Sequence, residues 1–255
     1  MDFIASAVTD IGITKDTNQD SFGVKVLNTR LGSITIAIIC DGMGGYSHGE
    51  IASATVVKAF DKWILERLPV LCNEKITDSI IKNEWTQIIN DCNNKISSYG
   101  KQKGITLGTT ATIMMLTPTR YFIMNVGDSR AYEISNDVKV LTKDQTVVAK
   151  DVELGYITEE QAKTDPRRSV LLYAIGASYN IVPDMFYGET KKDAVYMLCS
   201  DGFRHEITSD EIYSYMNPSF MSEMSQMKQN MESLINLNKQ RQETDNITVV
   251  AVRTY

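Results

Sequence analysis

A run of apolar, mostly β-branched residues ends in an aspartate and a glycine-rich turn: Ile34-Thr35-Ile36-Ala37-Ile38-Ile39-Cys40-Asp41-Gly42-Met43-Gly44-Gly45. The apolar part predicts a strand that is covered on both faces. Glycines let a backbone approach a ligand closely, so the Gly42 carbonyl beside Asp41 is a candidate metal ligand. An ordinary strand-to-helix turn uses the same residues, and this motif alone does not decide between the two interpretations.

Three further aspartates lie beside strand-like runs elsewhere in the chain. They are Asp20 in Asn18-Gln19-Asp20-Ser21, Asp201 in Ser200-Asp201-Gly202, and Asp245 in Thr244-Asp245-Asn246. A carboxylate at a strand end is held rigidly and still faces a loop or cleft. Several such carboxylates repel one another unless a cation neutralises them, and oxygen ligands suit Mg²⁺ and Mn²⁺. The sequence therefore indicates a metal-activated water.

Short apolar segments dominate the chain, and two long amphipathic patterns interrupt them. The expected strands are 4–8, 22–27, 33–40, 109–116, 120–126, 130–134, 194–199 and 247–252. The spacing of apolar residues predicts helices over 49–68 and 78–99, ended by Pro69 and Gly100. A third helix carries Met224, Met227, Met231 and Leu234, a stripe expected in the core rather than on a binding face. This order predicts an α+β fold, a β-sandwich flanked by helices.

Composition narrows the class of protein. The 255 residues carry a net charge of −6 without a basic block, which argues against a nucleic-acid partner. No run of about 18 apolar residues is present and the N-terminus lacks a basic start, so we expect a soluble cytoplasmic protein without a membrane partner. The cysteines lack zinc-site spacing. Without repeats or a Pro-, Gly- or Ser-rich linker, residues 1–255 are expected to form one domain.

An ordered set of motifs resembles a known family. The set is Gly12-x-x-Lys15-x-x-Asn18-Gln19-Asp20, Asp41-Gly42-Met43-Gly44-Gly45, Gly108-Thr109-Thr110, Val126-Gly127-Asp128-Ser129-Arg130-Ala131-Tyr132, Leu141-Thr142-Lys143-Asp144, Ala174-Ile175-Gly176, Cys199-Ser200-Asp201-Gly202 and Asp245-Asn246-Ile247-Thr248. Each motif alone is weak, but together they resemble the bacterial form of the protein phosphatase 2C family. The resemblance implies two packed antiparallel sheets with helices on both outer faces. It also implies a metal-dependent phosphatase acting on phosphoserine and phosphothreonine in proteins that a serine/threonine kinase modifies.

Carried over to matching positions, the resemblance assigns ligands for two core ions, Mn²⁺ or Mg²⁺. Asp41 would bridge the two ions, and the Gly42 carbonyl would bind one of them. Asp201 and Asp245 would complete the shell of the other ion. Asp20 would act mainly through a metal-bound water. The four aspartates are therefore the expected catalytic residues.

Two further assignments follow from the same resemblance. Asp128, in the turn Gly127-Asp128-Ser129, matches the position that with Asp201 holds a third ion in bacterial members; the alternative is an aspartate that caps the turn. The segment 153–162 resembles the family's flap beside the active site, with Thr158 as the cap of a short helix. The alternative for the segment is a plain surface helix.

The chain departs from the family pattern at three positions. Lys15 stands where the family usually has an arginine that contacts the substrate phosphate. Lysine keeps the charge but loses the bidentate fork, which predicts weaker or looser phosphate binding. Gln19 stands where glutamate is common. Met43 stands where animal members have a histidine proposed as general acid, so protonation of the leaving group must come from water or another group, with His48 as one candidate.

A pseudophosphatase is the alternative function: a binding module that keeps the fold and recognises phosphoproteins without turnover. Retention of four clustered aspartates argues against it, because a pure binder has no evident need for these charges. The lysine at position 15 is the one feature in its favour. An assay of p-nitrophenyl phosphate hydrolysis with and without Mn²⁺ separates the two functions.

Overall fold

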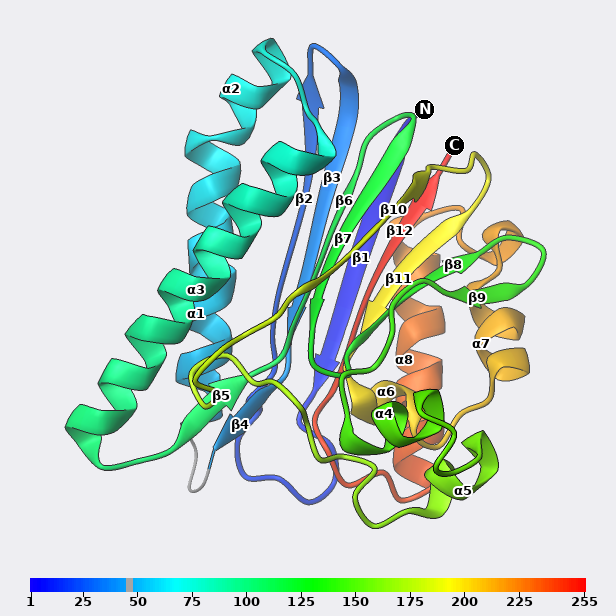
Figure 1. The fold of residues 1–255 in the computed structure, drawn as a ribbon. Coiled ribbons are helices and arrows are strands. Elements are labelled where there is room, and N and C mark those ends of the chain that lie inside the picture. Colours follow the sequence, from blue (N-terminus) through cyan, green and yellow to red (C-terminus); the bar gives the residue numbers. More distant parts are fainter. Residues whose placement is uncertain (45–47) are drawn as a thin grey trace.

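The computed structural model describes residues 1–44 and 48–255 and contains two five-stranded sheets packed face to face (Figure 1). The first sheet has the order β1 (Phe3–Asp10), β12 (Ile247–Thr254), β11 (Val195–Cys199), β8 (Arg130–Ile134) and β9 (Val138–Val140). The second has the order β10 (Asp184–Glu189), β7 (Arg120–Val126), β6 (Ala111–Leu116), β3 (Gly32–Cys40) and β2 (Ser21–Thr29). Neighbouring strands are antiparallel in both. The predicted α+β sandwich is confirmed.

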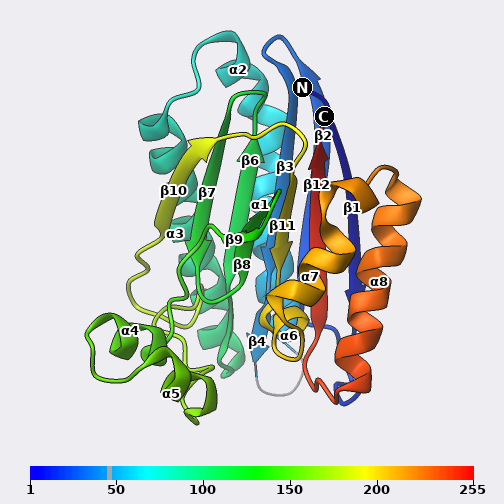
Figure 2. The same cartoon turned by 90° about the vertical axis from the view of Figure 1, so that its right-hand side faces the viewer.

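Helices cover both outer faces of the sandwich (Figures 1 and 2). The second sheet is covered by α1 (Gly49–Glu66), α2 (Leu68–Asn73) and α3 (Asp78–Lys103). The first sheet is covered by α6 (Asp201–Arg204), α7 (Ser209–Met216), the 3-10 turn η1 (Pro218–Phe220) and α8 (Met224–Gln240). The short helices α4 (Val147–Glu153) and α5 (Glu159–Thr164) lie at one end of the sandwich. None of the helices within the described residues has the length and apolar character needed to span a membrane.

Strand β3 shows how the layers are held together. Successive side chains of a strand point to opposite faces, so an unbroken apolar run supplies two apolar faces. Ile34, Ile36 and Ile38 pack in the cluster beneath the helices of the second sheet. Ala37 and Ile39 pack in the cluster between the sheets. The prediction that this strand is covered on both faces is confirmed.

Two predicted helix ends differ from the structure. Helix α1 ends at Glu66, and Pro69 lies in the first turn of α2, where its missing N–H costs nothing. Helix α3 continues through Gly100 to Lys103 and ends at Gly104, which adopts a left-handed conformation with φ of 66°. Gly100 is needed for close packing instead, because a Cβ there would collide with the Ile105 carbonyl.

Several strands also differ from the prediction. The expected strand 109–116 is interrupted at Thr110, and its first part, β5 (Leu107–Thr109), pairs with β4 (Gly42–Gly44). A hairpin turn over residues 135–137 connects β8 to β9, and the two strands pair antiparallel. Strand β10 was not predicted, because its sequence has no β-branched residue. In α8 the stripe is buried as expected at Met227, Met231 and Leu234, whereas Met224 is exposed.

We expect Leu198→Ala to destabilise the protein by about 2–5 kcal/mol, because the side chain is fully buried between the sheets and its removal leaves a cavity. Urea unfolding measures the change. Leu154→Ala is the matched control, since Leu154 is 51% exposed, and should change stability by less than about 0.5 kcal/mol. Equal effects in the two variants would contradict the proposed packing.

Candidate metal centre

The predicted aspartates lie at strand ends that meet at one end of the sandwich, called the active edge below (Figure 1). In an antiparallel pair, the start of one strand lies beside the end of the next. Asp20 precedes β2 and Asp41 follows β3, and the adjoining residues Ser21 and Cys40 are paired. In the other sheet Asp201 directly follows Ser200 at the end of β11, and Asp245 lies just before β12.

Hydrogen bonds tie the two sheets together at this edge. The Ser200 hydroxyl donates to Asp20 Oδ2 at 3.0 Å. The Asn246 side chain accepts from the Gln19 amide at 2.8 Å and donates to the Ile11 carbonyl at 2.9 Å. The loop that carries Asp20 is therefore fixed to the strand ends that carry Asp201 and Asp245.

Asp41 is held by its backbone, which leaves its carboxylate free for other contacts. The Asp41 amide donates to Thr110 Oγ1, and the Asp41 carbonyl accepts from the Thr110 amide, each at 2.9 Å. These bonds account for the interruption between β5 and β6. The neighbouring Gly42 must be glycine, because a Cβ would collide with the backbone oxygens of Gln19 and Gly49. Gly45, the last residue of the predicted motif, lies outside the described residues.

The pKa of Asp41 is raised well above its ordinary value. Burial is the largest cause, and the next are the negative charges of the other predicted ligands, listed by decreasing effect: Asp20, Asp201, Asp245 and Asp128. A charge acts on another in this way only over a short distance. The four other carboxylates therefore lie near enough to Asp41 for their charges to act on it.

The pKa of Asp20 is raised to about 7, first by burial and then by the charges of Asp201 and Asp245, against hydrogen bonds from Thr248 and Ser200 that lower it. One oxygen of Asp20 and one of Asp201 are buried, and neither has a hydrogen-bond partner among the described residues. Buried acceptors without partners are costly. Unpaired carboxylate oxygens in a repelling cluster are the donor set that a hard divalent ion satisfies.

Lys15 already supplies one positive charge to this cluster. Its ammonium group lies 2.8 Å from Asp245 Oδ1. Burial lowers the pKa of Lys15, but the hydrogen bond to Asp245 and the charges of Asp245, Asp41 and Asp201 outweigh it and raise the pKa overall. Within residues 1–44 and 48–255, no three His, Cys, Asp or Glu side chains are arranged to hold a metal ion.

The Lys15–Asp245 pair can open at little cost. Both side chains are well exposed, 45% and 37%, and exposed ion pairs contribute only about 0–1 kcal/mol. A divalent ion can therefore take the place of the ammonium group on Asp245. With Asp245 released, its carboxylate and the unpaired oxygens of Asp20 and Asp201 are the type of donor that suits a hard divalent ion.

Asp128 lies in different surroundings, which sequence reasoning missed. The Arg204 guanidinium donates to the Asp128 carbonyl at 3.0 Å and lies 3.9 Å from Asp128 Oδ2. Burial and the charge of Asp201 raise the pKa of Asp128 to about 7, although Arg204 lowers it. The position of Arg204, three residues after Asp201, is the sequence signal that could have revealed it.

His205 and Glu243 form a second set of contacts that the sequence did not reveal. His205 Nε2 lies 3.4 Å from Asp201 Oδ2, and Nδ1 lies 3.1 Å from Glu243 Oε2. The other oxygen of Glu243 accepts from the Asp245 amide at 2.9 Å. Burial lowers the pKa of His205, but the bond to Glu243 and the charge of Asp201 raise it overall. The Glu243 carboxylate thus contacts Asp245 directly and Asp201 through His205.

The flap-like segment folds as a short helix, as predicted. Thr158 Oγ1 accepts from the Gln161 amide at 3.2 Å, and the Gln161 side chain accepts from the Thr158 amide at 2.8 Å. These reciprocal bonds form a capping box at the start of α5. Tyr156, just before the helix, is 73% exposed.

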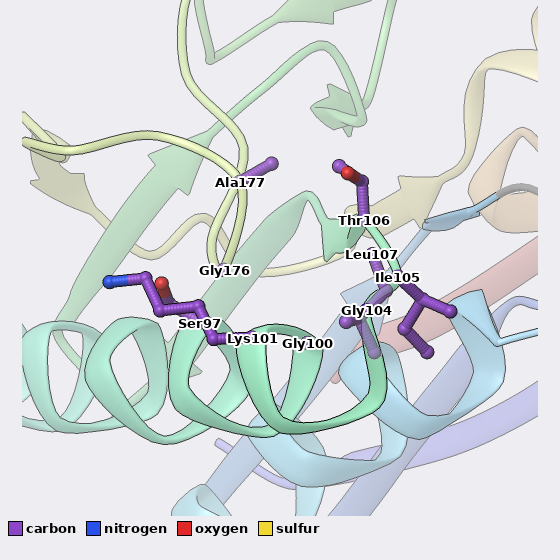
Figure 3. Close-up of a pocket in the computed structure, with 9 residues that line it drawn as sticks. All are labelled: Ser97, Gly100, Lys101, Gly104, Ile105, Thr106, Leu107, Gly176 and Ala177. Atoms are coloured by element: carbon purple, nitrogen blue, oxygen red, sulfur yellow. The ribbon is translucent and has the colours of Figure 1, made fainter.

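A cavity of about 310 Å³ lies beside α3, outside the carboxylate cluster (Figure 3). It is lined by Ser97, Gly100, Lys101, Gly104, Ile105, Thr106, Leu107, Gly176 and Ala177. A neighbouring hollow of about 250 Å³ shares Thr106, Leu107 and Ala177 and reaches Met43. None of the predicted carboxylate ligands lines either space, so the predicted chemistry does not belong there.

Known proteins resemble this chain in sequence and in fold. A family model described as protein phosphatase 2C matches residues 13–240. The serine/threonine phosphatase stp of Listeria innocua is 31% identical over 208 residues, which cover 80% of this chain and 79% of the relative. The crystal structure of serine/threonine phosphatase Stp1 from Staphylococcus aureus is 26% identical, with a TM-score of 0.82 and coverage of 98% and 94%. The catalytic domain of the phosphatase PstP, solved with two manganese ions, has the same fold: 24% identity, TM-score 0.77, coverage 98% and 97%.

The raised carboxyl pKa values predict that the metal-free protein loses stability with rising pH. A carboxyl group with a pKa of 3.8 unfolded and about 7 folded resists ionisation in the folded state. Its effect on the free energy of unfolding therefore becomes unfavourable as pH rises from near 3.8 to about 7. His205, with a raised pKa, acts in the same direction.

In the presence of EDTA, the urea midpoint should therefore be lower at pH 8 than at pH 6. Asp41→Asn should raise the midpoint at pH 8 and reduce the difference, because it removes one repelling charge. Asp210→Asn, an exposed aspartate at the start of α7, is the control and should leave the difference unchanged. A wild-type midpoint that is the same at both pH values would argue against a repelling cluster.

Proposed function

The chain belongs to the protein phosphatase 2C family, and we propose that it hydrolyses phosphoserine and phosphothreonine in proteins with the help of two divalent ions. The observation that carries the proposal is the cluster of buried carboxylates at one edge of the sandwich, two of which have an oxygen without a partner among the described residues. Clustered carboxylates with unsatisfied oxygens favour cation-dependent chemistry over a purely structural role.

Each residue of the cluster has a proposed task. Asp41 would help to hold both ions, and the Gly42 carbonyl would help to hold one of them. Asp201 and Asp245 bind the other ion, and Asp20 orients a coordinated water. When bound, Mn²⁺ or Mg²⁺ supplies the positive charge that lowers the pKa of water and neutralises phosphoryl oxygens. We propose two ions and not three, because Asp128 lies beside the Arg204 guanidinium and the core cluster does not.

The protein residues fix the geometry of the reaction. Asp20 is oriented by the Ser200 hydroxyl, and Asp41 by the backbone bonds to Thr110. Lys15 lies at the exposed side of the cluster. There its ammonium group can leave Asp245 and contact an oxygen of the substrate phosphate instead. As a point charge it holds one oxygen, whereas the family's arginine engages two. Met43 has no titratable group, so this position cannot donate a proton to the leaving group.

The partners and the domain follow from the same proposal. We propose phosphoproteins as substrates, modified by a serine/threonine kinase, with neither nucleic acid nor a membrane as partner, and a cytoplasmic location. We also propose that residues 1–255 form one domain, because β1 and β12 pair residue by residue from Phe3 with Thr254 to Asp10 with Ile247.

Activity should require a divalent ion and the aspartate cluster. We expect p-nitrophenyl phosphate hydrolysis with Mn²⁺ or Mg²⁺, and loss of hydrolysis in excess EDTA. Asp201→Asn should remove activity while the circular dichroism spectrum is retained, because one ligand of the cluster is lost. Asp210→Asn serves as the control and should keep wild-type activity. Full turnover in EDTA would rule out the metal mechanism, and a wild-type rate in Asp201→Asn would rule out this site.

Lys15→Ala should raise KM for a phosphothreonine peptide several-fold, because a charge that holds the phosphate is removed. Lys15→Arg should keep or lower KM, since the guanidinium fork can engage two oxygens. Mn²⁺ affinity should not fall in Lys15→Ala, because the variant removes a competitor for Asp245. Steady-state kinetics and calorimetric titration measure the two effects. An unchanged KM in Lys15→Ala would remove Lys15 from the phosphate site.

A further inference from the structure

Two basic side chains of one helical turn lie against the pair of aspartates that the sequence predicted for a third ion. Asp201 begins α6, Arg204 ends it, and His205 follows. Arg204 lies 3.9 Å from Asp128 Oδ2, and His205 Nε2 lies 3.4 Å from Asp201 Oδ2. Each carboxylate therefore faces a basic group from the same short segment.

Arg204 is fixed far more firmly than Lys15. Its side chain is only 14% exposed. Its Nη2 atom donates to the Asp128 carbonyl at 3.0 Å and to Asp144 Oδ2 at 3.4 Å. Moving the guanidinium away would leave a buried carbonyl and two carboxylates with fewer partners, which is costly. An ion at this place cannot displace Arg204 as easily as it displaces Lys15 from Asp245.

Positive charge already accompanies the carboxylates around Asp128, although Asp201 adds a further negative charge there. Asp144 accepts two hydrogen bonds from Arg130, each at 2.8 Å. Two guanidinium groups, Arg130 and Arg204, thus accompany two carboxylates, Asp128 and Asp144. A further divalent ion would bring uncompensated positive charge into a buried site, which is unfavourable. The core cluster is the opposite case, because its carboxylates outnumber the single ammonium group of Lys15.

Distance strengthens the argument. An ion bound to Asp128 Oδ2 at the usual oxygen distance of about 2.1 Å would lie within about 6 Å of the Arg204 guanidinium. Like charges this close, away from bulk water, repel strongly. The residues around Asp128 therefore do not fit a third ion.

We propose that Arg204 takes the place of a third cation beside Asp128 and Asp201, so that the chain binds two ions and no third. The proposal rests on the proposed phosphatase function and refines its metal site. Arginine stays protonated at all working pH values. Arg204 is accordingly a positioning residue: it holds Asp128 against the turn that carries Asp201, and its charge does not depend on the metal concentration.

The test is the number of Mn²⁺ ions bound per chain, counted by native mass spectrometry and by the electron paramagnetic resonance signal of free Mn²⁺ during titration. We expect two ions in the wild type and in Arg204→Lys, which keeps the charge. Arg204→Met should bind three, because the positive charge beside Asp128 is removed. The double variant Arg204→Met/Asp128→Asn should return to two.

A wild-type count of three would overturn the inference, as would a count of two in folded Arg204→Met. Asp128→Asn alone gives an answer even if Arg204→Met does not fold: an unchanged count of two supports the inference, and a fall from three to two overturns it. A wild-type chain that binds no Mn²⁺ would overturn the proposed phosphatase function, and a count of three would leave that function intact.

Discussion

Mutual repulsion among buried carboxylates is the constraint on which the active edge of this protein depends. Burial raises the pKa values of Asp20, Asp41 and Asp128, and the negative charges of neighbouring aspartates raise them further. Such a cluster persists only where the surrounding backbone holds it and where positive charge is available. The chain meets the second need with an exposed lysine at the core cluster and a buried arginine beside Asp128, and these two cations differ in how easily they leave.

Backbone and side-chain hydrogen bonds that cross between the sheets hold the carboxylates in place. Ser200 and Asn246, at the ends of the first sheet, hold the loop that leads into the second. Thr110 holds Asp41 through two reciprocal bonds, at the cost of interrupting a strand. Glu243 holds the Asp245 amide and, through His205, contacts Asp201. The sandwich core supplies rigidity, and these bonds turn it into fixed carboxylate positions.

Sequence patterns predicted the layers and the aspartates, because both depend on local signals. The run from Ile34 to Cys40 predicts a doubly covered strand, and an aspartate at its end predicts a held carboxylate. The role of Arg204 and that of His205 depend on which segments meet in space, which periodicity does not report. Gly100 was misread as a helix end for the same reason: its requirement is the nearby Ile105 carbonyl, not its own backbone conformation. Strand β10 was missed because pairing with β7, not its own composition, makes it a strand.

The position of β12 has a consequence for protein synthesis. This strand lies between β1 and β11, so the first sheet cannot close until residues 247–254 have left the ribosome. The strand β1, made more than two hundred residues earlier, has β12 as its one neighbour in the sheet and stays unpaired on both edges until then. Because Asp245 lies just before β12, the set of predicted ligands is incomplete until this part of the chain has been made. The carboxylate cluster is therefore completed together with the first sheet, by the same stretch of chain.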